Sequence, residues 1–342
     1  MNMTKIKMTD IAEKVGVSVA AVSFALNDKP GVSEDIRRAI LKAAEEMGYE
    51  RNEKSKSRMR DKEHLLILNC SRTAITYDIF PQTPYFSELL RAFEERLNSE
   101  SYHFWIKSIC IDKNFKQNID TLLSNQQVDG VLLVATDMEE SDIRIVQEIE
   151  PNVVILDSCY DRLTANCVVM DNYLGGMLAA QHFLELGHAR FGYVQSRVRI
   201  YNFDMRKQGF MDELARNGMA IKPQDILEVD ASIEASYKTL AQKEFLGSDR
   251  PTCYFAENDY MAIGLLRALQ KKGISVPEQV AVIGFDNIDM AGIVTPSLTS
   301  INVPKNKLAE ICISQLMHML EHEQYWGIKQ FISVNIVKRK ST

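Results

Sequence analysis

From residue 65 onward the chain alternates short apolar runs with amphipathic helical stretches, and this alternation limits its fold more than any other feature. The apolar runs are 65–68, 102–106, 128–134, 153–156, 167–170, 190–194, 252–256, 280–284 and 331–337. Helical periodicity lies between them, for example over 87–97, 173–186, 206–217 and 260–272. Repeated strand–helix units predict parallel sheets with helices on both faces, and about 280 residues suffice for two such sheets. Ligands of this architecture bind at the carboxyl ends of strands, often between domains.

The first 50 residues show helical periodicity only. A first helix, capped by Thr9, is expected to end at Gly16, and a second helix is capped by Ser18. A third helix follows Ser33 and stops at Gly48. Two helices joined by a glycine turn form a candidate helix-turn-helix, whose second helix enters the major groove of DNA. The alternative is an ordinary three-helix bundle.

Charge is distributed unevenly along the chain. The net charge of −6 argues by itself against nucleic acid as a partner. Residues 1–62, however, hold 13 Lys and Arg against 10 Asp and Glu, a net charge of +3, which leaves −9 on the remainder. A basic N-terminal segment on an acidic body favours a DNA-binding head. Residues 50–63, ERNEKSKSRMRDKE, have almost no apolar content and are interpreted as a linker, or as a segment that folds only on a partner.

The remaining signals exclude several classes of protein. No stretch approaches ~18 apolar residues and no secretory pattern opens the chain, so no membrane span and no secretion are expected. The six cysteines form no C-x-x-C pair and are expected to be reduced core residues of a cytoplasmic protein. No G-x-G-x-x-G, Walker loop or G-x-S-x-G elbow occurs, so neither catalysis nor a cofactor is predicted. His318 and His322 have a spacing that can suit a metal, but without a third ligand they are interpreted as surface or dimer-face histidines.

A series of motifs carries a specific resemblance. In the N-terminal segment they are Thr9-Asp10-Ile11-Ala12, Gly16-Val17-Ser18, Val22-Ser23, Leu26-Asn27, Gly31-Val32-Ser33 and Ala44-x-x-Met47-Gly48-Tyr49. Further on they are Pro84-Tyr85-Phe86-Ser87-Glu88-Leu89, Val128-Asp129-Gly130-Val131, Leu186-Gly187-His188-Ala189-Arg190, Arg206-Lys207-Gln208-Gly209-Phe210, Glu257-Asn258-Asp259-x-Met261-Ala262-x-Gly264, Val282-Ile283-Gly284-Phe285-Asp286 and Thr295-Pro296-Ser297-Leu298-Thr299-Ser300-Ile301, followed by Val303-Pro304. In order and spacing, over nearly the whole chain, they resemble the LacI/GalR (lac repressor/galactose repressor) family of transcriptional regulators.

The resemblance implies a homodimer on pseudo-palindromic double-stranded operator DNA. The fold it implies is an all-α helix-turn-helix head followed by an α/β periplasmic-binding-protein-like sensor with two parallel-sheet lobes. We expect the head at 1–49, a hinge or linker at 50–63, and an effector-binding and dimerisation domain at 64–342. Lobe 1 is predicted at about 64–160 and 289–322, and lobe 2 at about 161–288 and 323–342. The helix at 305–320 is apolar enough to help form the dimer, although burial within one lobe would explain it equally.

The residues predicted to contact DNA are Thr9, Ser18, Val19, Ala20, Ser23, Phe24, Asn27, Asn52, Ser55, Arg58 and Met59. By position in the family, base readout falls on Val19, Ala20 and Phe24. These side chains are apolar and make no bidentate hydrogen bond to guanine, so we predict contacts with thymine methyl groups and recognition of DNA shape.

The hinge departs from the family, which usually has Pro-Asn, then Ala, and a Leu that wedges into the minor groove. Here the aligned residues are Arg51-Asn52, Ser55 and Arg58, with Met59 next. Three alternatives stay open: Arg58 lies in a narrow minor groove, Met59 wedges after a one-residue shift, or the segment is a solvated basic linker that contacts phosphates only.

The resemblance assigns effector binding to Arg206, Asn258 and Asp286, whose guanidinium, amide and carboxylate groups can hold a hydroxylated ligand at fixed angles. Aromatic candidates for the apolar face of the site are Phe80, Tyr85, Phe86, Tyr201 and Phe203, and weaker polar candidates near the lobe junction are Asp157 and Asp171. A sugar or sugar derivative is the favoured effector. The alternatives are a purine-type corepressor, a ligand-blind regulator, and, with less support, a soluble sugar-binding protein or an enzyme.

Overall fold

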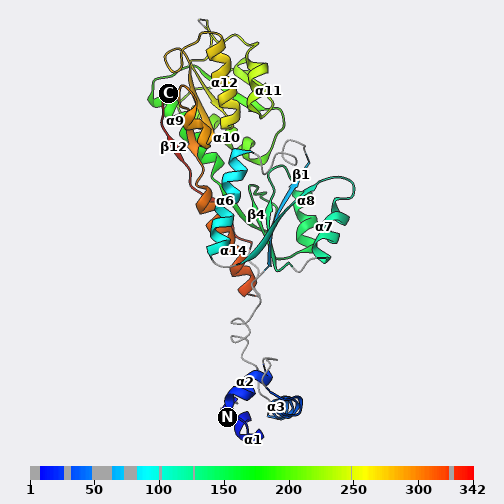
Figure 1. Cartoon of the computed structure of the whole chain (residues 1–342). Coiled ribbons are helices and arrows are strands. Elements are labelled where there is room, and N and C mark those ends of the chain that lie inside the picture. Colours follow the sequence, from blue (N-terminus) through cyan, green and yellow to red (C-terminus); the bar gives the residue numbers. More distant parts are fainter. Residues whose placement is uncertain are drawn as a thin grey trace. The chain divides into compact units, whose positions relative to one another are not determined.

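The computed structural model describes residues 8–26, 32–47, 64–72, 83–99, 102–125, 128–247, 249–322 and 327–342. The chain divides into two compact units, Met1–Asp61 and Lys62–Thr342. The described elements of the first unit are all helices, whereas the second unit holds two sheets with their helices (Figure 1). The predicted fold class, a helical head followed by an α/β sensor with two sheets, is therefore confirmed.

The first unit contains α1 (Met8–Val15), α2 (Val19–Leu26) and α3 (Glu34–Glu46). Gly16 ends α1 with φ +73°, a conformation that glycine adopts without steric cost. Ser18 caps α2, because its Oγ accepts a hydrogen bond from the backbone N–H of Ala21 at 3.1 Å. The prediction of Thr9 as a cap is wrong, since α1 begins one residue earlier and encloses Thr9.

One small core joins the three helices. Its buried members are Ile11, Ala12, Val22, Ala25, Leu26, Ile40, Ala43 and Ala44. A core of this size stabilises a unit of about 60 residues only marginally.

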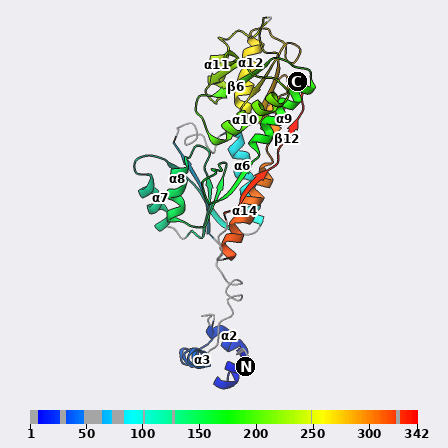
Figure 2. The ribbon, with the colours of Figure 1, turned by 180° about the vertical axis from the view of Figure 1, so that it is seen from behind.

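Lobe 1 is defined by a six-stranded sheet in the order β11-β5-β4-β3-β1-β2. Its strands, all parallel, are β1 (His64–Ser71), β2 (His103–Cys110), β3 (Gly130–Val134), β4 (Val153–Leu156), β5 (Asn166–Met170) and β11 (Lys329–Ile332). α6 (Pro84–Ser99) and α14 (Lys305–Glu321) lie side by side on one face, and α7 (Phe115–Ser124) and α8 (Glu140–Ile149) lie on the other (Figures 1 and 2). Along β3 the side chains alternate between two separate apolar clusters, Leu132 in one and Leu133 in the other, because both faces of the sheet are covered.

Lobe 2 is defined by a second six-stranded sheet in the order β12-β10-β9-β8-β6-β7. Its strands are β6 (Phe191–Ser196), β7 (Ile226–Val229), β8 (Cys253–Ala256), β9 (Ala281–Asp286), β10 (Thr299–Asn302) and β12 (Asn335–Val337). Its helices are α9 (Asn172–Glu185), α10 (Tyr201–Arg216), the 3-10 turn Pro223–Asp225, α11 (Ile233–Leu240), α12 (Asp259–Lys271) and α13 (Asp289–Ile293). All described strand pairs are parallel except β10 with β12.

Two glycines set the distance between α9 and α10. A Cβ atom at Gly176 would collide with the carbonyl oxygen of Arg206, and one at Gly209 would collide with that of Tyr173. The helices therefore approach more closely than any larger residue allows, and this contact fixes the position of α10 against lobe 2.

Sheet pairing corrects the predicted lobe boundaries in three places. β5 lies in segment 161–288, predicted as lobe 2, but pairs with β4 of lobe 1. β10 lies in segment 289–322, predicted as lobe 1, but pairs with β9 of lobe 2. β11 lies in segment 323–342, predicted as lobe 2, but pairs with β5 of lobe 1. The single apolar run 331–337 consequently contains parts of two strands in different sheets. Apolar periodicity identifies a strand but not its partner, which is why these boundaries were wrong.

The chain crosses between the lobes at three short connections. These lie between β5 and α9 at Asp171, between β10 and α14 at residues 303–304, and between β11 and β12 at residues 333–334. Short connections of this kind are where hinge motions of two lobes concentrate. Among the described residues, no helix is both long and apolar enough to cross a membrane.

Candidate functional site

The head exposes part of the predicted DNA-contacting set. Thr9 and Ser18 are exposed, and Val19, the first residue of α2, is 44% exposed. Ala20, Ser23 and Phe24 lie on α2, but their side chains are outside the described part of the structure. The other predicted DNA contacts, Asn27, Asn52, Ser55, Arg58 and Met59, fall outside the described residues, and so does the hinge segment 50–63.

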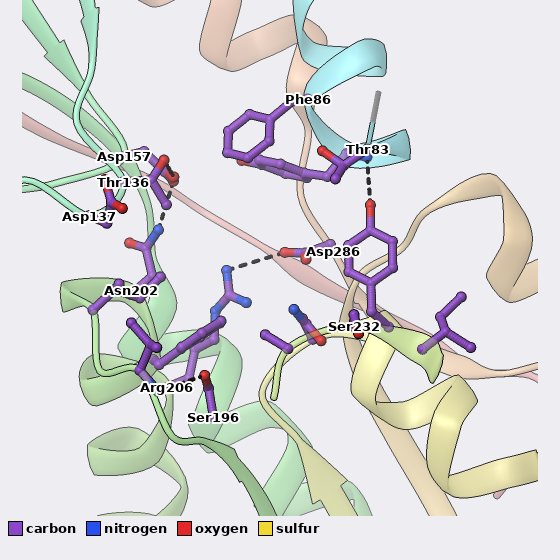
Figure 3. Close-up of a pocket in the computed structure, with 18 residues that line it drawn as sticks. Thr83, Phe86, Thr136, Asp137, Asp157, Ser196, Asn202, Arg206, Ser232 and Asp286 are labelled. Atoms are coloured by element: carbon purple, nitrogen blue, oxygen red, sulfur yellow. Dashed lines mark hydrogen bonds and ion pairs between the residues drawn. The ribbon is translucent and has the colours of Figure 1, made fainter. Parts of the chain in front are cut away.

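A cavity of about 290 Å³ lies between the two lobes (Figure 3). It is lined by Thr83, Tyr85, Phe86, Thr136, Asp137, Asp157, Ser196, Val198, Ile200, Asn202, Phe203, Arg206, Ala231, Ser232, Ile233, Asn258, Tyr260 and Asp286. Many of these residues end a strand or directly follow one, as Asp157 follows β4 and Asp286 ends β9. The cavity thus occupies the position at which two parallel sheets bind small ligands.

All six residues predicted for the effector site line this cavity, namely Tyr85, Phe86, Asp157, Arg206, Asn258 and Asp286. Phe203 lines it as well. Tyr201 does not line the cavity. Its ring lies 6.1 Å from that of Tyr160, which is not a lining residue either. Asp171 instead caps α9, accepting a hydrogen bond from the backbone N–H of Leu174. Phe80 lies outside the described residues.

Sequence reasoning missed several lining residues, of which Asn202, Val198 and Ile233 bear most on the site. Val198 lies in the loop between β6 and α10, and Ile233 opens the helix after β7. Their position after the carboxyl ends of strands is a signal that could have identified them.

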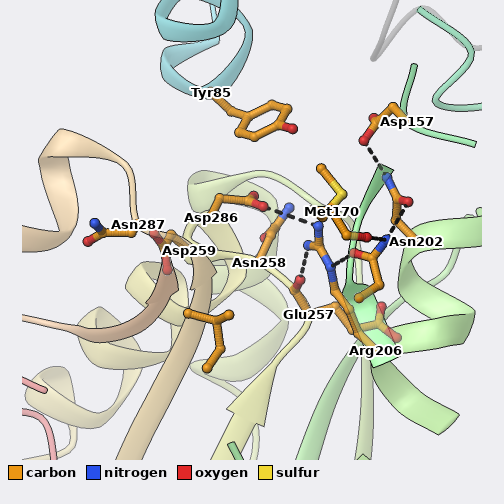
Figure 4. A network of polar contacts seen from close by, with 12 residues as sticks. Tyr85, Asp157, Met170, Asn202, Arg206, Glu257, Asn258, Asp259, Asp286 and Asn287 are labelled. Atoms are coloured by element: carbon orange, nitrogen blue, oxygen red, sulfur yellow. Dashed lines mark hydrogen bonds and ion pairs between the residues drawn. The ribbon is translucent and has the colours of Figure 1, made fainter. Parts of the chain in front are cut away.

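Arg206 is the centre of the polar side of the cavity (Figure 4). Its Nε donates to Oδ1 of Asn172 at 2.9 Å, its Nη1 donates to the carbonyl oxygen of Glu257 at 2.6 Å, and its Nη2 lies 3.2 Å from Oδ1 of Asp286. The guanidinium carbon lies 3.6 Å from the centroid of the Phe285 ring. With only 4% of its side chain exposed, Arg206 is held rigidly by this set of contacts.

Each lobe contributes one buried aspartate with a positive φ. Asp157 of lobe 1 has φ 75° and Asp286 of lobe 2 has φ 102°. Such conformations cost an aspartate about 1–3 kcal/mol and are found most often at ligand sites. Burial raises the pKa of Asp286 to about 6, although Arg206 and Lys305 lower it. Burial also raises the pKa of Asp157, which hydrogen bonds from Thr136 and Asn202 lower.

Glu257 anchors the loop that carries Val198. Its carboxylate is fully buried and accepts hydrogen bonds from the Arg199 Nη1 at 2.8 and 2.9 Å and from the backbone N–H of Ser196 at 2.7 Å. Burial raises the pKa of Glu257 to about 7, against the attraction of Arg199. Since its main-chain carbonyl also holds Arg206, Glu257 connects one wall of the cavity to the central guanidinium.

Asp259, at the start of α12, is a third buried acid of lobe 2. Its Oδ1 accepts from the Ser300 hydroxyl at 2.6 Å and its Oδ2 from the backbone N–H of Ile288 at 2.9 Å. Burial, together with the charge of Asp286, raises the pKa of Asp259 to about 8. It therefore keeps a proton in the folded state at pH values where an exposed aspartate has lost it.

Two tyrosines that line the cavity, Tyr85 and Tyr260, connect the lobes. The backbone N–H of Tyr85, on α6, donates to the hydroxyl of Tyr260, on α12, at 3.1 Å. The hydroxyl of Tyr85 itself is buried and has no hydrogen-bond partner among the described residues. A buried hydroxyl without a partner costs free energy, and a bound ligand could supply that partner.

The described residues contain no group of three or more His, Cys, Asp or Glu side chains able to hold a metal. The rings of His318 and His322 stack at 4.2 Å, and Nδ1 of His322 lies 3.0 Å from the carbonyl oxygen of His318. His318 and His322 therefore contact each other at the C-terminal end of α14.

Two family models match the chain. Residues 7–52 match the model of bacterial regulatory proteins of the lacI family, and residues 180–342 match that of a periplasmic binding protein-like domain. Among relatives, the HTH-type transcriptional repressor PurR of Mannheimia succiniciproducens is 26% identical over 97% of both chains. The Ribose operon repressor of Haemophilus influenzae is 27% identical over 92% of both chains.

A solved structure shares the whole fold. The lac repressor dimer bound to operator and the anti-inducer ONPF matches with a TM-score of 0.72 and 22% identity, over 99% of each chain. The fold and the interlobe cavity define a periplasmic-binding-protein-like sensor that follows a helix-turn-helix head. The chain belongs to the lacI family of bacterial regulatory proteins. It is a DNA-binding transcriptional regulator and not an enzyme.

Proposed function

We propose that this protein is a repressor whose affinity for its operator is controlled by a small polar effector, a sugar or sugar derivative, bound between the lobes. The observation that carries this proposal is the convergence of Tyr85, Phe86, Asp157, Arg206, Asn258 and Asp286 on one cavity. Their guanidinium, amide and carboxylate groups can donate and accept hydrogen bonds at fixed angles, and the rings of Tyr85 and Phe86 can cover an apolar ligand face.

Effector control follows from the contacts that the lobes make with each other. Asn202 of lobe 2 donates to Asp157 of lobe 1 at 2.8 Å, and Tyr260 of lobe 2 accepts from Tyr85 of lobe 1. A ligand that touches both lobes changes the free-energy difference between their orientations. In a homodimer this orientation sets the spacing of two heads, so ligand binding and DNA binding are reciprocally coupled.

For the DNA side, we propose a head at 1–49 and a hinge at 50–63 that together engage a pseudo-palindromic operator in the cytoplasm. Ser18 binds a phosphate, and Val19, Ala20 and Phe24 read thymine methyl groups and DNA shape. The relatives named repressors and the operator-bound lac repressor dimer support this assignment.

The test begins with the operator. The full chain is used to select binding sites from random duplex DNA, and affinity for the selected site is measured by fluorescence anisotropy with and without each ligand of a panel. The proposal expects at least one sugar to change the operator affinity by tenfold or more, typical of an allosteric coupling of 1–3 kcal/mol. A strict guanine opposite Phe24 would contradict the proposed base readout.

The panel consists of sugars, sugar phosphates and nucleobases, and ligand binding is measured in parallel by thermal shift. A ligand at 100 times its Kd stabilises the protein by ~2.7 kcal/mol. A nucleobase as the tightest ligand would favour the purine-type corepressor instead. A panel without any effect on Tm or operator affinity would favour the ligand-blind regulator.

A further inference from the structure

Glu88 and Lys305 form an ion pair that lies outside the cavity and is largely removed from water. The Lys305 Nζ lies 3.0 Å from the carboxylate of Glu88, and only 9% of the lysine side chain and 15% of the glutamate side chain are exposed. Both residues belong to helices of lobe 1, Glu88 to α6 and Lys305 to α14, and neither lines the cavity. Because two charges buried in this way lose much of their hydration, the pair needs further hydrogen bonds to be stable.

Those hydrogen bonds come from lobe 2, from the loop of residues 286–289 at the end of β9. The Lys305 Nζ donates to the main-chain carbonyl oxygen of Asp286 at 2.9 Å. The backbone N–H of Asp289 donates to Oε1 of Glu88 at 3.3 Å. The ion pair of lobe 1 therefore binds both ends of a loop of lobe 2, through hydrogen bonds in which one partner is charged.

Within lobe 2 the same loop is held firmly in place. The backbone N–H of Asn287 donates to the Ser300 hydroxyl at 3.0 Å, and its Nδ2 donates to Oδ1 of Asn302 at 2.9 Å. Nη2 of Arg339 donates to Oδ1 of Asn287 at 2.7 Å. Asp286 and Asn287 have positive φ values of 102° and 47°, a region with few allowed conformations (Figure 4). Since the loop is fixed in its own lobe, holding it from lobe 1 stabilises one orientation of the two lobes.

Lys305 also connects this contact to the ligand site. It is the first residue of α14, directly after the crossing at residues 303–304, and its Nζ lies 5.5 Å from the centroid of the Tyr85 ring. It binds the main chain of Asp286, whose side chain lines the cavity. Burial raises the pKa of Asp286 to about 6, and the positive charges of Arg206 and Lys305 oppose this rise. Lys305 thus acts on two lining residues, Tyr85 and Asp286, from outside the cavity.

The packing of α6 against α14 does not by itself explain the ion pair. The two helices lie side by side and already contribute buried apolar side chains to one core cluster, among them Leu89 of α6 and Leu308 of α14. A buried ion pair within one lobe adds little stability beyond what an apolar contact gives. An apolar contact, however, could not bind the polar main chain of lobe 2.

We infer that Glu88 and Lys305 are positioning residues, which together form an interlobe clamp on residues 286–289 and set the orientation of the lobes without touching the effector. This inference rests on the proposed function and adds to it the regulation of the protein in the absence of ligand. In the proposed mechanism the lobe orientation controls operator affinity. Weakening the clamp should therefore change that affinity before any effector is added.

The decisive variant exchanges the two charges, Glu88→Lys together with Lys305→Glu. It can keep an ion pair within lobe 1, but position 305 no longer donates to the Asp286 carbonyl and position 88 no longer accepts from the Asp289 N–H. The matched control is the exchange Lys307→Glu with Glu310→Lys, because these residues form an exposed ion pair at 2.8 Å on the same helix. Lys305→Arg is the conservative variant, since it retains the charge and a donor.

The first measurement is amide hydrogen exchange of the full chain without ligand, followed residue by residue by NMR. We expect the Asp289 N–H to exchange at least about tenfold faster in the Glu88/Lys305 exchange variant. The Ile288 N–H, which donates to Oδ2 of Asp259 within lobe 2 at 2.9 Å, should be unchanged and shows that the lobe is still folded. Neither rate should change in the control. Unchanged exchange at Asp289 would overturn the clamp.

The second measurement is the affinity of the ligand-free full chain for a binding site selected from random duplex DNA. We expect the Glu88/Lys305 exchange variant to change this affinity at least about fivefold, and Lys305→Arg and the control to stay within about twofold of the unmodified chain. Lys305→Met, which removes the donor to Asp286 without introducing a negative charge, should change the affinity in the same direction and replaces the exchange variant if that variant does not fold.

An operator affinity that none of the Glu88 and Lys305 variants alters would overturn the inference and leave effector control by a bound ligand intact. If the unmodified chain selects no operator, the proposed function fails instead. The exchange rate at Asp289 would still decide whether the clamp exists, because that measurement involves neither DNA nor ligand.

Discussion

Lobe 1 and lobe 2 each place one buried aspartate with positive φ at the cavity, but they surround it differently. Asp157 of lobe 1 is held by a hydroxyl and an amide, whereas Asp286 of lobe 2 faces a guanidinium. Lobe 2 also contains the buried carboxylates Glu257 and Asp259. At the cavity, lobe 2 therefore relies on a pair of opposite charges, Arg206 and Asp286, whereas lobe 1 relies on neutral hydrogen bonds and aromatic side chains.

The largest effect is expected from Arg206→Ala in lobe 2. The substitution leaves Asp286 as an unpaired buried carboxylate, which typically costs about 3–5 kcal/mol of unfolding free energy. Ligand binding should be lost as well. Thermal and chemical denaturation measure the effect. Arg216→Ala, on the same helix, is the control, because Arg216 is 54% exposed in its pair with Glu213 and should contribute less than about 1 kcal/mol. Equal losses of unfolding free energy in Arg206→Ala and Arg216→Ala would contradict the idea that Arg206 balances the buried charge of Asp286.

The second largest effect is expected from Asp259 in lobe 2, and it is a dependence of the unfolding free energy on pH. The folded state holds its proton to a pH of about 8, whereas the unfolded chain loses it near 3.8, so stability falls as pH rises between these values. Glu257 and Asp286, with pKa values raised to about 7 and about 6, contribute in the same direction. With Asp259→Asn, the decrease in unfolding free energy between pH 5 and pH 8 should be smaller by about 2–3 kcal/mol.

Denaturation curves from pH 5 to pH 8 measure this difference. Asp161→Asn in lobe 1 is the control, because its exposed carboxylate should leave the slope unchanged. An unchanged slope in Asp259→Asn would show that Asp259 is ionised in the folded protein.

A smaller effect on the unfolding free energy is expected at Tyr85 and Tyr260, where the two Phe variants should differ in the direction of the change. Tyr260→Phe removes the acceptor of the Tyr85 backbone N–H and should lower stability by about 1–2 kcal/mol. Tyr85→Phe removes a buried hydroxyl without a partner, so the stability of the free protein should stay constant or rise by up to about 1 kcal/mol. Its ligand affinity should nevertheless fall. A loss of stability in Tyr85→Phe without a loss of affinity would contradict a ligand contact by this hydroxyl.

The smallest effect is expected at a surface ion pair of lobe 1. Lys116 and Glu148 lie 3.1 Å apart, and each side chain is 63% exposed. Lys116→Ala should therefore change the unfolding free energy by no more than about 0.5 kcal/mol. A thermal shift comparable to that of Arg206→Ala would mean that lobe 1 depends on charge as much as lobe 2 does.

Local patterns predicted much of this molecule. The period of the apolar residues identified most strands and helices, and capping chemistry placed Ser18 before α2. The family resemblance, read together with the hydrogen-bonding and aromatic chemistry that a ligand site needs, selected six side chains that line the cavity. These features are local because they depend on a few neighbouring residues and on the regular geometry of helices and strands.

The tertiary structure alone decided which strands share a sheet and how the cavity is charged. Cys167 of β5 pairs with Lys329 of β11, and β5 also pairs with β4, so both strands belong to the sheet of lobe 1 although they were predicted in lobe 2. The positive φ of Asp157 and the burial of Glu257 likewise had no signature in sequence. Such features arise from contacts between residues that are far apart in the chain. Local sequence therefore determines that a strand or a polar side chain is present, and packing determines its partner.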